Sequence, residues 1–256
     1  MSLSAGQTLL LGVIAGGTIF LGLPVARLPV SLRTKHLLNG GAIGILLFLL
    51  VEIMHGALEP VEHAFEVAFV DGGRFVLSLP VALVVGLGLG LVGLAWFDDR
   101  YITNQSGARS IAIMIAAGIG FHNFSEGLAI GQSAASGALS LALLLVVGFA
   151  LHNITEGFGI AAPLSGERTS FAFLGGLGLI AGGPTLVGTL VGQLWTSNVA
   201  SVFFLALAGG ALIYVIQELF RVRIRELSTA AVFGAVAVGF LLGFATEIVV
   251  VVGMGG

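Results

Sequence analysis

The run ALSLALLLVVGFALHNITEGFGIAAP, residues 138–163, decides the fold class of this chain. Its first half is almost wholly apolar, and the run exceeds the ~20 residues that a helix needs to cross the ~30 Å hydrocarbon core of a bilayer. Its second half carries His152 and Glu156 among apolar neighbours. Ionisable side chains are costly in lipid and usually serve a function there. The run therefore predicts a membrane span and a polar site within it.

The whole chain shares the composition of this run. Of its 256 residues, 57% are hydrophobic and 9% are charged, and the mean hydropathy is +1.10, whereas about 25% of the residues of an average soluble domain are charged. The chain has no cysteine, so every metal ligand must be a nitrogen or an oxygen. Neither the net charge of −3 nor any sequence motif indicates a nucleic-acid partner.

The apolar runs are too long, and alternate too little, to be the strands of a membrane barrel. We therefore predict an all-α, polytopic membrane protein, an eight-transmembrane-helix bundle that forms a single domain over residues 1–256. The predicted helices lie at about 4–24, 37–58, 75–97, 109–133, 138–163, 171–193, 199–220 and 228–252.

The basic residues predict how the chain crosses the membrane. Nine of the ten Lys and Arg residues follow odd-numbered spans, and loops that stay in the cytoplasm retain such residues. We therefore expect a multi-pass protein of the inner or plasma membrane with both termini outside. The outer mouth carries Glu59, Glu62, Glu66 and Asp71, and a negative vestibule would concentrate cations.

Two copies of one motif stand out inside the fourth and fifth predicted spans: HNFSEG at 122–127 and HNITEG at 152–157. In each copy His and Glu are four residues apart, so they share one face of a helix. An antiparallel hairpin with its apex near Leu139 would place His122 opposite Glu156 and Glu126 opposite His152. Two imidazoles and two carboxylates around one point suit Zn²⁺ or another first-row divalent ion.

The alternative is that these polar side chains only join helices through hydrogen bonds. Recurrence of the whole pattern favours the metal site over that alternative. The numerous glycines have a simpler interpretation, since small residues allow helices to pack closely. They would also allow a homodimer without requiring one.

The repeated motif, the eight spans and the external termini resemble the ZIP family of zinc- and iron-regulated transporters, of the bacterial or archaeal type. The resemblance implies transport rather than catalysis, with Zn²⁺ as the first candidate for the transported substrate and Fe²⁺, Mn²⁺, Co²⁺ or Cd²⁺ as further ones. It also implies a ligand set on the fourth and fifth helices. The residues so implied are His122, Glu126, His152 and Glu156, with Asn123 and Asn153 beside them.

The chain departs from the family pattern at two places. Ser125 and Thr155 stand where the family usually has Pro, and either hydroxyl can bond the carbonyl one turn earlier, Phe121 or Leu151. In the sixth span Gly183 precedes Pro184, where many bacterial relatives have Glu. We therefore expect one tightly held ion, with a weaker second position as the alternative.

Other acidic residues are candidates for the path of an ion. Glu52, His55 and Glu59 form a stripe on the second predicted span that could lead inward, although Pro60 is expected to bend or end that helix. Glu247, in the last span, fits either a packing or an entrance role. Candidate exit residues are Glu218, Asp98 and Asp99.

Two further hypotheses stay open at this stage. An intramembrane zinc-dependent hydrolase could use the same ligands to activate water, although the sequence has no HExxH motif and no obvious separate general base. A structural or signalling membrane protein would use the motifs only for packing.

Overall fold

The computed structural model describes residues 3–69, 77–97, 99–100, 107–194, 197–221 and 227–253. Within these ranges, the side chains of residues 97, 152, 218, 221, 249–251 and 253 are not part of the description. The described residues contain no strand, and eight helical segments are long and apolar enough to cross a membrane. The predicted fold class is therefore confirmed.

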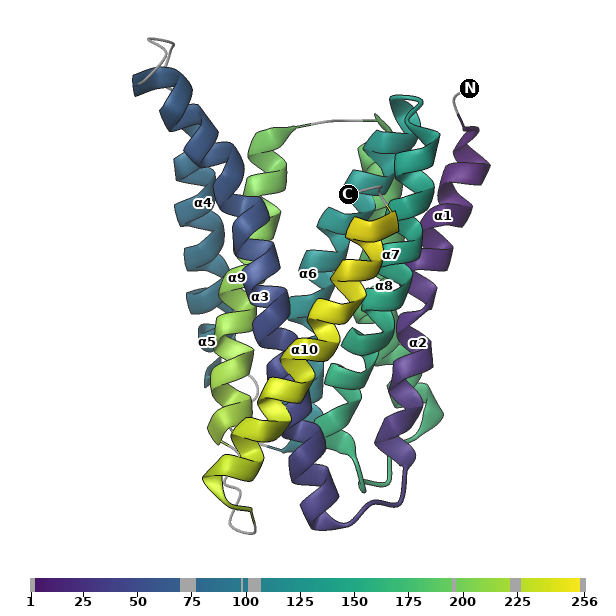
Figure 1. Cartoon of the computed structure of the whole chain (residues 1–256), viewed down its shortest axis with the longest axis vertical. Coiled ribbons are helices and arrows are strands. Elements are labelled where there is room, and N and C mark those ends of the chain that lie inside the picture. Colours follow the sequence, from purple (N-terminus) through teal and green to yellow (C-terminus); the bar gives the residue numbers. More distant parts are fainter. Residues whose placement is uncertain are drawn as a thin grey trace.

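Figure 1 shows these helices running between the two ends of an elongated bundle. The α-helices are α1 (Ala5–Gly17), α2 (Ile19–Gly22), α3 (Leu32–Phe69), α4 (Ser78–Gly88), α5 (Leu94–Phe97), α6 (Ala108–Ala135), α7 (Leu139–Ala161), α8 (Phe171–Leu194), α9 (Asn198–Arg221) and α10 (Thr229–Gly253). The short segments are the 3₁₀ turns η1 (Leu23–Arg27) and η5 (Ala162–Leu164) and the π-helical turn η2 (Leu89–Gly93).

The second span differs most from its prediction. It was expected at 37–58 with a bend or end at Pro60, but α3 continues through Pro60 to Phe69. A proline removes one helical hydrogen bond, and neighbouring groups can satisfy the freed carbonyl within a bundle. The last part of this helix, residues 59–69, is called the α3 arm below. It carries Glu59, Glu62 and Glu66.

Two other predicted spans are less regular than expected. The first is interrupted at Thr18, whose hydroxyl donates a hydrogen bond to the Ala15 carbonyl over 2.8 Å, and it then continues as α2 and η1. The third changes from α4 through the π-helical turn η2 into α5. Each span still reaches from one end of the bundle to the other (Figure 1).

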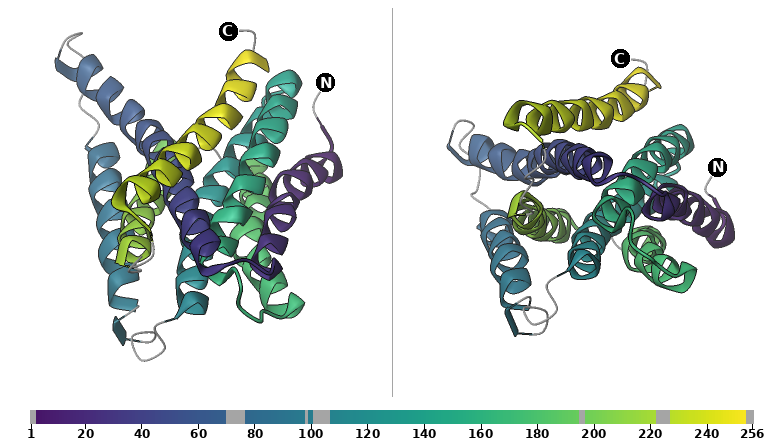
Figure 2. Two further views of the ribbon diagram at one scale, coloured as in Figure 1. Left: turned by 60° about the horizontal axis from the view of Figure 1, so that its bottom comes forward. Right: turned by 90° about the horizontal axis from the view of Figure 1, so that it is seen from below.

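The helices form two groups, visible from below in Figure 2. One group consists of α1, α6, α7 and α8, and the other of α3, α4, α9 and α10, with α3 and α9 nearest the first group. Within both groups glycines lie against backbone. A Cβ at Gly127 of α6 would meet the Thr185 carbonyl of α8, and one at Gly44 of α3 would meet the Val236 carbonyl of α10. These glycines therefore have the packing role predicted for them.

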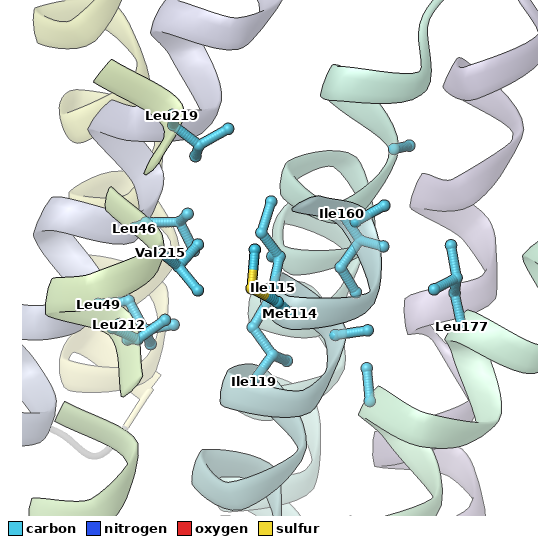
Figure 3. Close-up of a cluster of buried hydrophobic side chains, with 14 of the residues drawn as sticks. Leu46, Leu49, Met114, Ile115, Ile119, Ile160, Leu177, Leu212, Val215 and Leu219 are labelled. Carbon is cyan, nitrogen blue, oxygen red and sulfur yellow. The ribbon is translucent and has the colours of Figure 1, made fainter. Parts of the chain in front are cut away.

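A layer of buried apolar side chains joins the two groups (Figure 3). It includes Leu46 and Leu49 of α3, Val215 of α9, and Ile115 and Ile119 of α6. Ile119 lies one helical turn before His122, so this layer separates the first motif from the end of the bundle where α6 begins.

The two ends of the bundle differ in charge. The start of α1 and the end of α10 lie at the same end (Figure 1). The connections at the opposite end carry basic residues, and there Lys35 Nζ lies 3.0 Å from Glu167 Oε1. The described basic residues of that end include Arg27, Arg33, Lys35, Arg109 and Arg168.

Candidate metal centre

The two motif helices form an antiparallel hairpin, and the hairpin sets the register of the motifs. Helix α6 ends at Ala135 and α7 begins at Leu139, with Gly137 between them at φ +78°. A residue in this left-handed conformation often ends a helix, and glycine adopts it without strain. The predicted apex near Leu139 is therefore wrong by about two residues, because Leu139 already belongs to α7.

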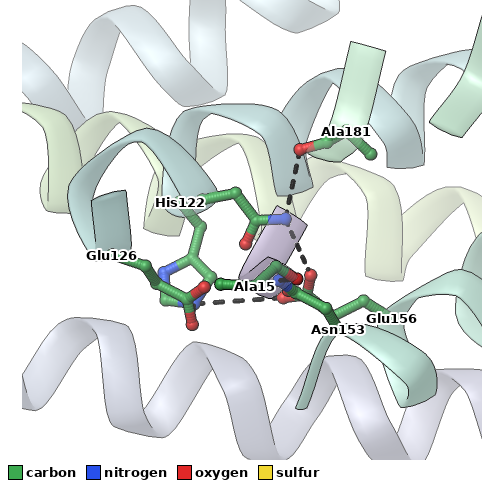
Figure 4. Close-up of polar contacts among 7 residues, drawn as sticks. Ala15, His122, Glu126, Asn153, Glu156 and Ala181 are labelled. Atoms are coloured by element: carbon green, nitrogen blue, oxygen red, sulfur yellow. Dashed lines mark hydrogen bonds and ion pairs between the residues drawn. The ribbon is translucent and has the colours of Figure 1, made fainter. Parts of the chain in front are cut away.

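The register nevertheless brings His122 of α6 opposite Glu156 of α7. His122 Nε2 lies 3.9 Å from Glu156 Oε1 and 3.2 Å from Glu126 Oε1 on its own helix. The side chains of all three residues are at most 7% exposed. One imidazole nitrogen thus faces two carboxylates from two helices inside the bundle (Figure 4).

The asparagine of each motif is fully buried and bonds a neighbouring helix. Asn123 Nδ2 donates to Glu156 Oε2 over 3.0 Å and to the Ala181 carbonyl of α8 over 3.1 Å. Asn153 Nδ2 donates to the Ala15 carbonyl of α1 over 2.8 Å. These acceptors fix both amide orientations, because only the NH₂ group can donate.

Several buried oxygens around this point accept no hydrogen bond from the described residues. They are the Oδ1 atoms of Asn123 and Asn153 and the Oε2 atom of Glu126. Buried oxygens without donors are costly unless a cation or another donor satisfies them. The donor set at this point is therefore suited to a divalent cation that accepts N and O ligands.

The remaining predicted ligand of the second motif is His152. Its backbone belongs to α7, one turn before Glu156, but its side chain lies outside the described residues. The described side chains contain no group of three His, Cys, Asp or Glu that is arranged to hold a metal ion. The His122 distances agree with that, since 3.2 and 3.9 Å are hydrogen-bond and ion-pair separations, longer than the ~2.0–2.2 Å of zinc ligation by N and O.

The two departures from the family pattern have structural counterparts. Ser125 Oγ has no hydrogen-bond partner among the described residues, so its hydroxyl does not make the bond to the Phe121 carbonyl that its position allows. A Cβ on Gly183 would meet no atom within 4 Å. Helix α8 instead meets the motifs through the Ala181 carbonyl, in the turn that Pro184 interrupts.

The predicted entrance residues differ in how far they are buried. His55 and Glu59 are exposed on α3, whereas Glu52 is half-buried and lies within electrostatic range of His122 and Glu126. Glu52 also lies within electrostatic range of Glu247 of α10. No local sequence pattern predicts this proximity, because the two residues lie far apart along the chain.

The predicted exit residues are less fully described. Asp98 lies outside the described residues, as does the side chain of Glu218, and Asp99 is exposed.

A comparison with protein-family models matches residues 98–246 to the ZIP Zinc transporter family. The match covers more than half of the chain and includes both copies of the motif. No curated protein matches the chain.

Proposed function

The chain belongs to the ZIP zinc transporter family, and on that basis we propose that it takes Zn²⁺ up into the cytoplasm through the site on α6 and α7. Membership makes it a multi-pass membrane protein that transports divalent metal ions, and the family is one of transporters rather than enzymes. The proposal adds three points to family membership: the ion is Zn²⁺, it moves into the cytoplasm, and residues of α6 and α7 bind it.

The observation that carries the proposed site is the placement of His122 between Glu126 and Glu156. A buried imidazole and two buried carboxylates offer the N and O ligands that Zn²⁺ accepts. We assign the remaining ligand to His152, which α7 places one turn before Glu156. Asn123 and Asn153 lie beside these ligands in the proposed site, where Asn123 bonds Glu156 and each amide bonds a neighbouring helix.

The direction of transport is proposed from the distribution of charge. With the basic end of the bundle in the cytoplasm, both termini and the α3 arm lie outside. The exposed Glu59, Glu62 and Glu66 would then draw cations toward the bundle. Glu218, Asp98 and Asp99 are proposed to receive the ion at the cytoplasmic end.

The identity of the ion is a separate question from the position of the site. Fe²⁺, Mn²⁺, Co²⁺ and Cd²⁺ accept the same donor types as Zn²⁺. Initial uptake rates across this panel, measured in proteoliposomes at equal free ion concentration, test the assignment. We expect Zn²⁺ to give the highest ratio of maximal rate to half-saturating concentration.

The site itself is tested by the double variant His122→Ala/Glu156→Ala. Zn²⁺ uptake by proteoliposomes is expected to fall to the level of empty vesicles, because the variant removes ligands from both helices. The matched control is His63→Ala/Glu167→Ala, which removes the same two residue types from exposed positions that have no role in the proposed path. Uptake by the first variant at the rate of the control would show that the site is misassigned.

A further inference from the structure

The basic end of the bundle carries positive charge that the described residues leave unbalanced. Lys35 pairs with Glu167, and Arg109 donates a hydrogen bond to the Arg168 carbonyl over 3.3 Å, which bonds a neutral group. Arg27 and Arg168 are exposed, and neither forms an ion pair with a described residue. The described part of this end therefore presents guanidinium groups that are free to bind an anion.

The guanidinium of Arg27 is held against an aromatic ring. Arg27 is the last residue of η1, and its Cζ lies 4.0 Å from the centroid of the Phe171 ring, where α8 begins. Such stacking uses the face of the guanidinium, so the N–H donors in its plane remain available. A planar group oriented in this way can bond a phosphate through two parallel N–H groups. The contact thus prepares a phosphate-binding group between η1 and α8.

The surface next to Arg27 is apolar and follows the seam between α2 and α8. Figure 2 shows the first span beside α8 in the view from below. Phe20 of α2 covers Gly178 of α8, because a Cβ at Gly178 would meet its ring, yet Phe20 is still 39% exposed. Phe171 is 73% exposed, and one turn later nothing lies within 4 Å of a Cβ at Gly175. An acyl chain could therefore lie along this seam.

Both sides of the seam end at the level of the lipid headgroups. Arg27 is the last residue of one candidate span, and Phe171 is the first residue of another. Anionic lipid headgroups gather at basic helix ends at this level of a membrane. A soluble anion could use the guanidinium, but it would gain nothing from the apolar surface beside it. The combination of the two therefore favours a lipid.

We propose that the seam between α2 and α8 binds a lipid with an anionic phosphate headgroup. Arg27 binds the phosphate, and an acyl chain lies over Phe20 and Gly175. The lipid covers surface that the described residues leave exposed, and it neutralises a charge that they leave unpaired.

Helix α2 joins this lipid site to the second copy of the motif. A Cβ at Gly22 would meet the Ile154 carbonyl of α7, and a Cβ at Gly157 of the motif would meet the Ile19 carbonyl of α2. One side of α2 thus packs on the motif helix, while Phe20 packs on α8 beside the proposed lipid. A lipid bound there would hold α2 against the helix that carries the second copy.

The proposal is tested by native mass spectrometry of the purified full-length protein, titrated in detergent with phosphatidylglycerol or phosphatidylcholine. We expect the unmodified protein to bind phosphatidylglycerol more tightly. Arg27→Gln should weaken that binding about fivefold, the effect of one basic residue at a membrane surface. Arg33→Gln, a matched change at an exposed arginine of the same end, should keep the affinity. Equal affinities for the two lipids, or equal affinities of the two variants for phosphatidylglycerol, would overturn the proposal.

Two further measurements separate a lipid from a free anion and cover a variant that does not fold. Excess inorganic phosphate should leave phosphatidylglycerol bound to the unmodified protein, and displacement would assign the site to a soluble anion instead. Should Arg27→Gln aggregate, phosphatidylglycerol with a photoreactive acyl chain is cross-linked to the unmodified protein. Peptide mapping is expected to find the label within residues 19–28 or 171–179, and label confined to other segments would contradict the proposal.

Discussion

Each copy of the motif contacts a flanking helix through its Asn and its Gly, but the two copies contact different helices. In the first copy Asn123 bonds the Ala181 carbonyl of α8, and Gly127 lies against the Thr185 carbonyl of the same helix. In the second copy Asn153 bonds the Ala15 carbonyl of α1, and Gly157 lies against the Ile19 carbonyl of α2. The Asn and Gly positions thus fix each motif helix to a flanking helix.

The copies differ in one respect that bears on the site. Asn123 also donates to Glu156 of the other copy, whereas Asn153 donates to the Ala15 carbonyl of α1. The first copy therefore orients a ligand of the second. The comparison teaches that an internal repeat can be symmetric in its attachment to the bundle and still be unequal at the site.

The largest expected effect tests whether both copies supply a histidine to the ion. Loss of a direct ligand should exceed the ~10–100-fold cost of removing a group that only orients one. We therefore expect His122→Ala and His152→Ala each to lower Zn²⁺ uptake by more than about 100-fold. Initial rates in proteoliposomes at matched protein content measure this. Near-normal uptake by His152→Ala would show that only the first copy supplies a histidine to the ion.

The next effect tests the unequal roles of the asparagines. Asn123→Ala removes a bond to Glu156 as well as one to α8, so we expect it to weaken Zn²⁺ binding by ~10–100-fold, and Asn153→Ala by about tenfold or less. Equilibrium dialysis gives both affinities. The control is Asn39→Ala, a buried asparagine of α3 that bonds the Leu219 carbonyl near the end of α9. Equal losses in Asn123→Ala and Asn153→Ala would contradict the inequality.

A smaller effect concerns only the packing of each motif helix against its flanking helix. Gly127→Ala and Gly157→Ala each place a methyl group against a carbonyl of the flanking helix, and overpacking of this kind costs ~1–3 kcal/mol. Both variants should unfold at lower temperature than the unmodified protein in a fluorescence-detected thermal assay. Gly159→Ala is the matched control, because its Cβ would lie 4.0 Å from Leu46 Cδ2, the nearest atom of a neighbouring helix. Thermal stability of Gly127→Ala equal to that of the control would show that α6 can move away from α8.

The smallest effect concerns Ser125 of the first copy. Its hydroxyl has no partner among the described residues, so Ser125→Ala should change the free energy of unfolding by less than about 0.5 kcal/mol. Thermal unfolding and Zn²⁺ uptake measured side by side check this. A marked loss of uptake at unchanged stability would instead place the hydroxyl on the ion's path.

The sequence alone was sufficient for the eight spans and for the opposition of His122 to Glu156. Lipid requires long apolar helices, and the helical period places residues four apart on one face. The antiparallel hairpin then leaves little freedom in pairing, so an error of about two residues in the apex did not prevent this contact.

Only the tertiary structure decided the contacts between distant parts of the chain. How the helices pack decides which carbonyls accept the hydrogen bonds of Asn123 and Asn153, and it decides that α3 continues through Pro60 and that Glu52 comes within electrostatic range of Glu247. Glycine positions allow close approach at many places, and the choice among them is made by the fit of whole helix surfaces. That fit joins residues nearly two hundred positions apart, which no local pattern in the sequence specifies.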